Sequence, residues 1–243
     1  MRYAIISDIH GNLEAFKASL DKLSAERIDS YLFVGDVVGY GANPKECIKL
    51  LKDLNPVIAV AGNHEWGVLD KMDGSYFNES AQSAIIWTKN ILDKDDLEYF
   101  SSFPLVYEDE RMTLVHGTLN APEEFYYIFD TEDAYVTLSQ MKNPLCFVGH
   151  SHVPGIFVSC DHTKVEFIER ADIRIDYERR YIINVGSIGQ SRDGDPRASF
   201  AIYDDEESCI EIKRVEYDVK KAQGKILKAG LPPKLAYRLS EGR

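Results

Sequence analysis

Eight side chains that can bind metal ions or move protons occur at similar places along this sequence, near the ends of short apolar runs and close to glycines. Five are imidazoles, two are carboxylates and one is a carboxamide. Ligands of this mixed hardness suit Mn, Fe, Zn or Ni better than Ca or a thiolate-held zinc. Gathering so many polar groups would be unfavourable without a shared purpose, and metal binding supplies one. The residues are Asp8, His10, Asp36, Asn63, His64, His116, His150 and His152.

Two pairs of these residues have a spacing that directs both side chains to one side of the chain. Asp8 and His10 lie two residues apart, and so do His150 and His152. In an extended segment, residues with this spacing point the same way. The remaining histidine, His162, falls in a predicted turn, and we expect it to be structural or exposed.

The first candidate ligands follow strands that alternate with helices. Apolar runs at residues 3–6, 31–34 and 57–60 end directly before the polar segments, and helical periodicity covers 13–25 and 44–54. In α/β sheets, sites form beyond the carboxyl ends of strands. The spacing therefore predicts that these segments meet at one edge of a sheet.

The second half of the chain is richer in strands. Runs at 111–115 and 145–148 end at His116 and before His150, and turns join the later strands, which favours antiparallel pairing. We expect the last residues, around Pro232 and Pro233, to form a polar tail. The later predicted strands are 155–159, 165–169, 181–184, 199–203 and 209–215, and the later predicted helices are 80–92, 95–100 and 219–228.

The composition is that of a globular protein, with 44% hydrophobic and 28% charged residues among 243. No linker-like or low-complexity tract interrupts the sequence, so we expect a single domain over residues 1–243. The formal net charge of -12 disfavours a long nucleic acid as partner and therefore a nuclease. A small anionic substrate remains compatible, because bound metal ions reverse the potential locally.

The cysteines and the apolar segments bear on location. Cys47, Cys146, Cys160 and Cys209 form no C-x-x-C pair, which favours free thiols in a reducing compartment. No segment approaches the ~20 apolar residues that a membrane span requires. We therefore expect a cytoplasmic protein without a membrane partner, and the sequence leaves open whether it is a homo-oligomer.

Five motifs in register resemble those of the calcineurin-like metallophosphoesterase superfamily. They are D-x-H at 8–10, G-D at 35–36, G-N-H-E at 62–65, H-G at 116–117 and G-H-x-H at 149–152. The segment 184–189 also resembles the N-x-G-S loop of the bacterial phosphodiesterase-like branch. The resemblance implies an α/β (α+β) fold of the metallo-dependent phosphatase type, a four-layer αββα sandwich of two mixed sheets flanked by helices.

The resemblance also implies a division of the ligands between two divalent transition-metal ions. Manganese is the ion we expect in vitro, with Fe, Zn or Ni as alternatives. A metal-bound hydroxide would attack the phosphorus in line. His64 would face the phosphoryl group and protonate the leaving oxygen, or else support the site from behind its ligands. One ion would be held by Asp8, His10 and His152, the other by Asn63, His116 and His150, with Asp36 bridging.

The sequence departs from the Ser/Thr protein phosphatases of this superfamily at the two arginines that grip the phosphate. The corresponding stretches are 39–41, Gly-Tyr-Gly, and 65–67, Glu-Trp-Gly. This departure favours a phosphodiester or nucleotide over a phosphoprotein. Arg192 is the candidate substrate-binding residue; Arg197 lies nearby, and either could instead pair with a neighbouring aspartate in a solvated turn.

These observations predict a metal-dependent phosphoric ester hydrolase that acts on a phosphodiester or phosphoanhydride of a small, nucleotide-like molecule, such as a dinucleoside polyphosphate. The aromatic cluster Phe125, Tyr126 and Tyr127 could stack a nucleobase, or pack a helix or a subunit contact. The alternatives are a phosphomonoesterase or protein phosphatase, and a non-catalytic scaffold that binds other proteins on the same fold.

Overall fold

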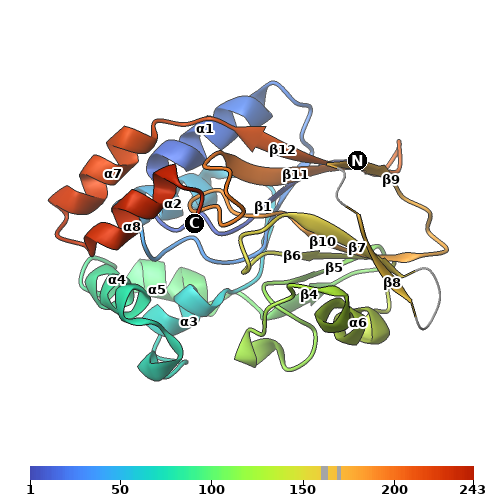
Figure 1. Ribbon diagram of the computed structural model, residues 1–243, viewed down its shortest axis with the longest axis horizontal. Helices are drawn as coiled ribbons and strands as arrows, with labels where there is room; N and C mark the ends of the chain where they lie inside the picture. Colours follow the sequence, from blue (N-terminus) through green and yellow to red (C-terminus); the bar gives the residue numbers. More distant parts are fainter. Residues whose placement is uncertain (160–163, 169–170) are drawn as a thin grey trace.

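Two six-stranded β-sheets packed face to face form the centre of the protein (Figure 1). The computed structural model describes residues 1–159, 164–168 and 171–243. In the first sheet the order is β3 (Val57–Ala59), β2 (Ser30–Phe33), β1 (Arg2–Ile6), β11 (Ala198–Asp204), β12 (Cys209–Val215) and β9 (Asp172–Arg174). In the second it is β4 (Val106–Glu108), β5 (Met112–Val115), β6 (Leu145–Val148), β10 (Arg180–Asn184), β7 (Gly155–Ser159) and β8 (Val165–Ile168).

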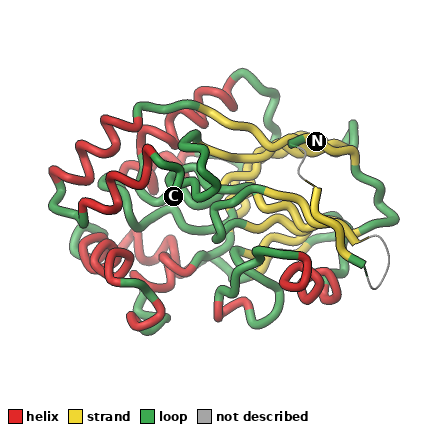
Figure 2. Tube along the Cα trace, viewed as in Figure 1, coloured by secondary structure: helices red, strands yellow, loops and turns green. Residues whose placement is uncertain are grey.

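Both sheets are mixed. Strands β1, β2 and β3 run parallel, as do β5, β6 and β10, and the remaining neighbours are antiparallel. The parallel strands are those that end at the candidate ligands, apart from β10. Figure 2 shows these strands running into a group of loops at the centre of the molecule, with most of the helices beyond them.

Helices cover the outer face of each sheet. The α-helices are α1 (Leu13–Ser24), α2 (Pro44–Asp53), α3 (Asn63–Val68), α4 (Glu79–Lys89), α5 (Lys94–Ser101), α6 (Thr131–Gln140), α7 (Val219–Lys228) and α8 (Pro233–Tyr237). Along β1, Tyr3 and Ile5 pack between the sheets, whereas Ala4 and Ile6 pack beneath α1 and α2. Helix α6 packs on the second sheet through its own core cluster. The predicted four-layer sandwich is confirmed.

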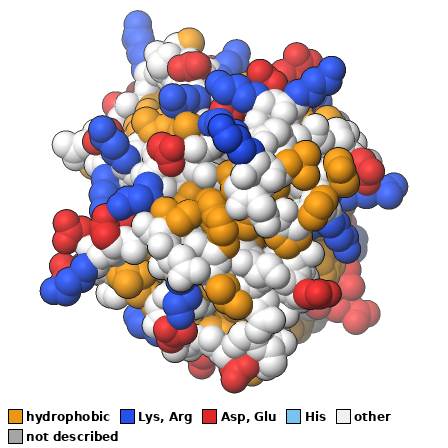
Figure 3. Space-filling model, turned by 90° about the vertical axis from the view of Figure 1, so that its left-hand side faces the viewer, with side chains coloured by type: hydrophobic (Ala, Val, Ile, Leu, Met, Phe, Trp, Pro, Cys, Tyr) orange, Lys and Arg blue, Asp and Glu red, His pale blue; other side chains and the backbone are white. Residues whose placement is uncertain are grey.

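The helical end of the molecule has a mixed surface. On the face that carries α7 and α8, hydrophobic side chains lie in the middle and Lys and Arg side chains stand around them (Figure 3). No helix in the described ranges combines the length and the apolarity needed to cross a membrane.

The sequence predicted most of these elements but was wrong about the C-terminal segment. Residues 229–243 are not a polar tail, because α8 and the 3-10 turn Arg238–Ser240 bury Leu231, Leu235 and Leu239. The prediction followed the two prolines, yet Pro233 occupies the first turn of α8, where a proline is tolerated. The expectations for Cys160, His162 and the last residue of the 165–169 strand lie outside the described residues.

Candidate metal centre

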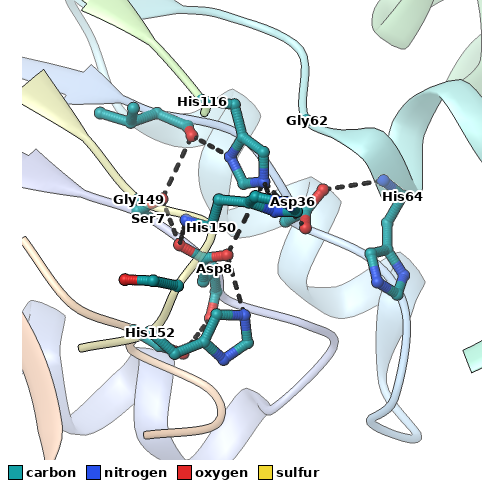
Figure 4. Close-up of polar contacts among 12 residues, drawn as sticks. Ser7, Asp8, Asp36, Gly62, His64, His116, Gly149, His150 and His152 are labelled. Atoms are coloured by element: carbon teal, nitrogen blue, oxygen red, sulfur yellow. Dashed lines mark hydrogen bonds and ion pairs between the residues drawn. The ribbon is translucent and has the colours of Figure 1, made fainter. Parts of the chain in front are cut away.

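Loops after strands of both sheets bring the predicted ligands together in one buried cluster (Figure 4). Three loops come from the first sheet, after β1, β2 and β3, and two come from the second, after β5 and β6. The cluster therefore joins the two sheets at the carboxyl ends of their parallel strands. Its side chains are those of Asp8, His10, Asp36, His116, His150 and His152, and Asn63 begins α3 beside them.

One group of ligand atoms forms around the carboxylate of Asp8. Its Oδ1 lies 3.1 Å from His152 Nε2 and 3.5 Å from His10 Nε2, and the two Nε2 atoms are 3.0 Å apart. A second group forms around Asp36, whose Oδ2 lies 3.2 Å from His116 Nε2 and 3.7 Å from His10 Nε2. His150 Nδ1 lies 3.1 Å from His116 Nε2. Asp36 thus faces both groups.

The outer ring nitrogens of three histidines are held by main-chain carbonyls. Donation from Nδ1 places the proton there and leaves the Nε2 lone pair directed into the cluster. The Nε2 atoms of His10 and His152 then face each other at 3.0 Å, a contact that a metal ion or a shared proton would stabilise. The pairs are His10 Nδ1 with Val38 O at 2.9 Å, His116 Nδ1 with Val34 O at 2.6 Å and His152 Nδ1 with Gln190 O at 2.5 Å.

Two buried oxygen atoms of the candidate ligands also lack hydrogen bonds. Asp8 Oδ1 and Asn63 Oδ1 are shielded from solvent and have no hydrogen-bond partner among the described residues. Acceptors of this kind are costly to bury unless a cation compensates them. The donor set of carboxylates, imidazoles and a carboxamide oxygen therefore fits divalent metal ions.

The pKa shifts in the cluster also indicate that its carboxylates are stabilised by positive charge. Burial opposes the charged form of His116, but the carboxylate of Asp36 outweighs it and raises the pKa of His116 to about 10. Burial likewise opposes ionisation of Asp8, but the imidazoles of His152, His10 and His116 together outweigh it, and the pKa of Asp8 is lowered. Without metal, the two carboxylates stay ionised and hold a proton in the cluster.

Backbone strain is concentrated at the same place. Left-handed φ angles are uncommon outside glycine and mark functional sites when they cluster. Six residues of this centre have such angles: Asp8 (52°), His10 (49°), Asp36 (64°), Tyr40 (57°), His150 (64°) and His152 (59°).

His64 lies beside the ligand cluster. Its main-chain nitrogen donates to Asp36 Oδ1 at 2.9 Å (Figure 4), and its ring packs against Tyr40 at 4.6 Å and His10 at 4.7 Å between ring centroids. Burial lowers the pKa of His64 to about 3, and its Nδ1 has no partner among the described residues. Gly39 leaves room for this ring, because a Cβ there would lie 2.0 Å from His64 Nδ1.

Glu65 supports the site in a way that the sequence did not reveal. Its carboxylate is buried and accepts hydrogen bonds from Asp36 N at 2.7 Å, Val37 N at 2.8 Å and Gly62 N at 2.9 Å. It thereby ties the loop after β2 to the start of α3. The residue belongs to the G-N-H-E motif, but only the folded arrangement shows what its oxygens bind.

Three further side chains position Asp8 and the loop of His150. Ser7 Oγ donates to Asp8 Oδ2 at 2.6 Å, and Ser187 Oγ donates to the Asp8 carbonyl at 2.8 Å. Asn184 Nδ2 donates to the Gly149 carbonyl at 2.8 Å. The segment 184–189, with its N-x-G-S sequence, therefore supports the first and last ligand loops.

The two arginines after this segment have different surroundings. Arg197 forms an exposed ion pair with Asp195, with Nη2 and Oδ2 2.6 Å apart, as expected for a solvated turn. Arg192 has no carboxylate partner among the residues that the structure describes. Its Nη2 donates to Tyr40 Oη at 3.3 Å, its guanidinium lies 5.8 Å from the Tyr40 ring centroid, and its main-chain nitrogen donates to the His152 carbonyl. The structure brings Arg192, and not Arg197, to the edge of the centre.

In the aromatic cluster Phe125–Tyr127, the first ring is buried and the other two are partly exposed. Phe125 is buried and packs edge-on against Trp66, with ring centroids 5.5 Å apart. Tyr127 stacks on the ring of His150, with centroids 3.9 Å apart, yet 40% of its surface remains exposed. Tyr126 is 52% exposed.

Both the sequence and the structure of this chain are similar to those of known phosphoesterases. The family model of the calcineurin-like phosphoesterase superfamily domain matches residues 1–208. The chain is 42% identical to the uncharacterized protein MJ0912 of Methanocaldococcus jannaschii, over 99% of this chain and 98% of that protein. It is 38% identical to a metallophosphoesterase from Sphaerobacter thermophilus, whose crystal structure superposes with a TM-score of 0.88 and covers 100% and 99% of the two chains. A symmetrical bis(5'-nucleosyl)-tetraphosphatase of Buchnera aphidicola is 37% identical over 87 residues, 32% of each chain.

Proposed function

Because this chain belongs to the calcineurin-like phosphoesterase superfamily, we propose that it hydrolyses a phosphodiester or phosphoanhydride bond in a small nucleotide-like substrate with the aid of two divalent metal ions. The family itself makes the protein a hydrolase of phosphoric esters. The observation that carries the proposal is the inward-facing set of ligand atoms, whose outer ring nitrogens are fixed by main-chain carbonyls.

The ligands divide as two groups that share one carboxylate. Asp36 Oδ2 faces both groups, and this favours its assignment as the shared ligand. Manganese is the ion we propose for assays, with Fe, Zn or Ni as alternatives. We assign Asp8, His10 and His152 to one ion, Asn63, His116 and His150 to the other, and Asp36 to both.

Divalent ions bound here supply charge that polarises a phosphoryl oxygen and lowers the pKa of water toward ~7. His64, whose ring packs beside His10 and Tyr40, is placed to hydrogen-bond the phosphoryl group and to give a proton to the leaving oxygen. Burial lowers the pKa of His64 and keeps its imidazole neutral. An anionic phosphate beside the ring would raise this pKa and favour the protonated form that donates the proton. Arg192 binds a phosphate oxygen from the rim of the site.

Two observations support a diester or anhydride over a phosphoprotein. Tyr40 occupies the stretch where the Ser/Thr protein phosphatases carry an arginine, and its ring packs on His10 with centroids 4.5 Å apart. The Buchnera relative is named a bis(5'-nucleosyl)-tetraphosphatase, which points to a phosphoanhydride between nucleosides. The exposed part of Tyr127 offers a surface for stacking a base.

The test is hydrolysis of bis-p-nitrophenyl phosphate and p-nitrophenyl phosphate by metal-stripped protein with Mn, Ni, Mg or no metal. We expect metal-dependent cleavage with the diester preferred. Asp36→Asn and His64→Ala should each reduce kcat by about 10²-fold or more, and Asp36→Asn should also lower the bound metal. Asp195→Asn, in the exposed turn, is the matched control and should retain activity.

The alternatives predict different results. A preference for the monoester would favour the phosphomonoesterase or protein phosphatase. No turnover with any metal, together with equal metal content in Asp36→Asn, would refute the enzyme and favour the protein-binding scaffold.

We further propose that residues 1–243 act as one cytoplasmic domain. The packing of α7 and α8 on Tyr40 supports one domain, since it ties the end of the chain to the site. The free thiols of Cys47, Cys146 and Cys209 support a reducing compartment.

A further inference from the structure

The C-terminal segment, residues 229–243, packs against the loops at the edge of the metal centre. It lies outside the part of the chain that the family model matches. Leu235 and Leu239 belong to the same buried cluster as Tyr40, and with His10 they line one small internal cavity. Gly194 N donates to the Gly242 carbonyl at 2.9 Å, next to the loop of Arg192. Figure 1 shows α8 and the C-terminus beside the central loops.

This segment places a second arginine near Arg192. Arg238, at the start of the last 3-10 turn, is half-buried. Its Nε donates to a main-chain oxygen of Arg243, which follows Gly242 in the chain. No hydrogen bond joins its two terminal amino groups to the residues that the structure describes. Leu239, next to Arg238 in the chain, packs in the same cluster as Tyr40, which accepts a hydrogen bond from Arg192. Burial and the nearby charge of Arg192 lower the pKa of Arg238.

Carboxylates are plentiful in this chain, yet none within the described residues pairs with either arginine. The acids closest in sequence to Arg192 are taken by other residues, since Asp193 pairs with Arg214 and Asp195 with Arg197. Two like charges held together in a partly buried place are unfavourable without an anion between them. Guanidinium groups suit phosphate oxygens, which they bind bidentately.

We infer that Arg192 and Arg238 together form an anion subsite beside the metal centre, which binds the phosphate groups next to the scissile one in a polyphosphate chain. The inference rests on the proposed function and narrows its substrate to phosphoanhydrides with at least two linked phosphates. A simple diester has no group to fill the subsite. Arg238 is thereby a specificity-determining residue that the C-terminal segment contributes.

The experiment compares wild-type, Arg238→Gln, Arg238→Lys and Arg197→Gln proteins, all full-length and loaded with Mn. Kinetics are measured on diadenosine tetraphosphate and on bis-p-nitrophenyl phosphate. Binding of inorganic tripolyphosphate is measured by calorimetry with free Mn matched in cell and syringe. Arg197→Gln removes the same charge from an exposed ion pair in the turn that follows Arg192, and thermal unfolding checks that each variant is folded.

Loss of charge-assisted hydrogen bonds to one phosphate weakens binding by about 10- to 100-fold. We therefore expect Arg238→Gln to raise KM for the tetraphosphate, and Kd for tripolyphosphate, by this factor. The kcat/KM for the diester should change by less than about twofold, and Arg238→Lys should recover most of the loss. Arg197→Gln should resemble wild type.

Equal losses on tetraphosphate and diester would overturn the inference, because they would indicate a structural role for Arg238. Unchanged tripolyphosphate binding in Arg238→Gln would overturn it as well. The calorimetric arm requires no turnover. If the wild-type protein cleaved neither substrate, the proposed function would fail, while tripolyphosphate binding that depends on Arg238 would still support the subsite.

Discussion

Replacing Glu65 by alanine should destabilise the protein and weaken its affinity for metal at the same time. The Glu65 carboxylate is fully buried and accepts three main-chain hydrogen bonds of 2.7 to 2.9 Å. Leaving a buried donor without a partner costs about 1–3 kcal/mol. With some entry of water into the space left behind, we expect about 3–5 kcal/mol for the three donors, a large part of the stability of an ordinary domain.

The same change releases the loop that carries Asp36. Asp36 N is one of the three donors, and Asp36 Oδ2 faces both ligand groups. Loss of a group that orients a metal ligand reduces metal affinity by about 10- to 100-fold.

Urea unfolding of the metal-free protein measures the stability term, and activity against free Mn concentration measures the affinity term. Glu98→Ala is the control, because Glu98 is exposed in an ion pair with Lys94 and should change stability by less than about 0.5 kcal/mol. If Glu65→Ala lost less than about 1 kcal/mol and kept its Mn dependence, the assigned role of Glu65 would be wrong.

Three further predictions concern the same centre. Gly39→Ala should lower kcat and destabilise the protein by about 1–3 kcal/mol, because the new methyl group meets His64 and the φ of Gly39 is +92°. The control is Gly224→Ala, at a helical glycine with open space around it. Equal Tm and kcat in the two variants would contradict the expectation. Burial lowers the pKa of His64 to about 3 from 6.5, so its contribution to stability is present above pH 6.5 and is lost as the pH falls toward 3. The free energy of unfolding of the metal-free protein should therefore fall between pH 7 and pH 5, and a slope that was no smaller in His64→Asn would refute this account. Removing metal with a chelator should lower Tm by several degrees, since a ligand at 100 times its Kd adds about 2.7 kcal/mol to the free energy of unfolding. Calorimetry with and without added Mn tests this, and an unchanged Tm would count against a tightly bound ion.

The sequence predicted the ligand-bearing strands well because those strands are apolar on both faces. β1 packs Ile5 on the other sheet and Ile6 on the helices, so its run is continuous and ends abruptly at Asp8. The short strands β4 and β9 are largely half-buried or exposed, and their weaker patterns were missed.

Elements whose formation depends on tertiary contacts were harder to predict. No helix is predicted at α3, because it begins with the polar residues Asn63, His64 and Glu65, yet the Glu65 carboxylate accepts from Gly62 N and closes the first turn. Helix α6 was also missed, although Asp130 caps it through two hydrogen bonds.

For the site, residue types and order sufficed to group the ligands but not to choose between neighbours. Arg192 and Arg197 lie in the same polar stretch, and no local pattern separates them. Only the fold shows that Asp195 pairs with Arg197, whereas Tyr40 lies beside Arg192. Arg238 was missed for the same reason, because 46 positions separate it in sequence from Arg192.

The left-handed backbone of the ligand loops limits how this centre can be redesigned or transplanted. A β-branched side chain is a poor occupant of such a position, whereas aspartate, asparagine and histidine tolerate it. Copying Asp8, His10, His150 and His152 onto ordinary strand ends of another scaffold would reproduce the atoms and not their directions. A designer would need to carry over the turn geometry first, with Gly39 and Glu65 among the transferred positions, and choose the metal-binding side chains afterwards.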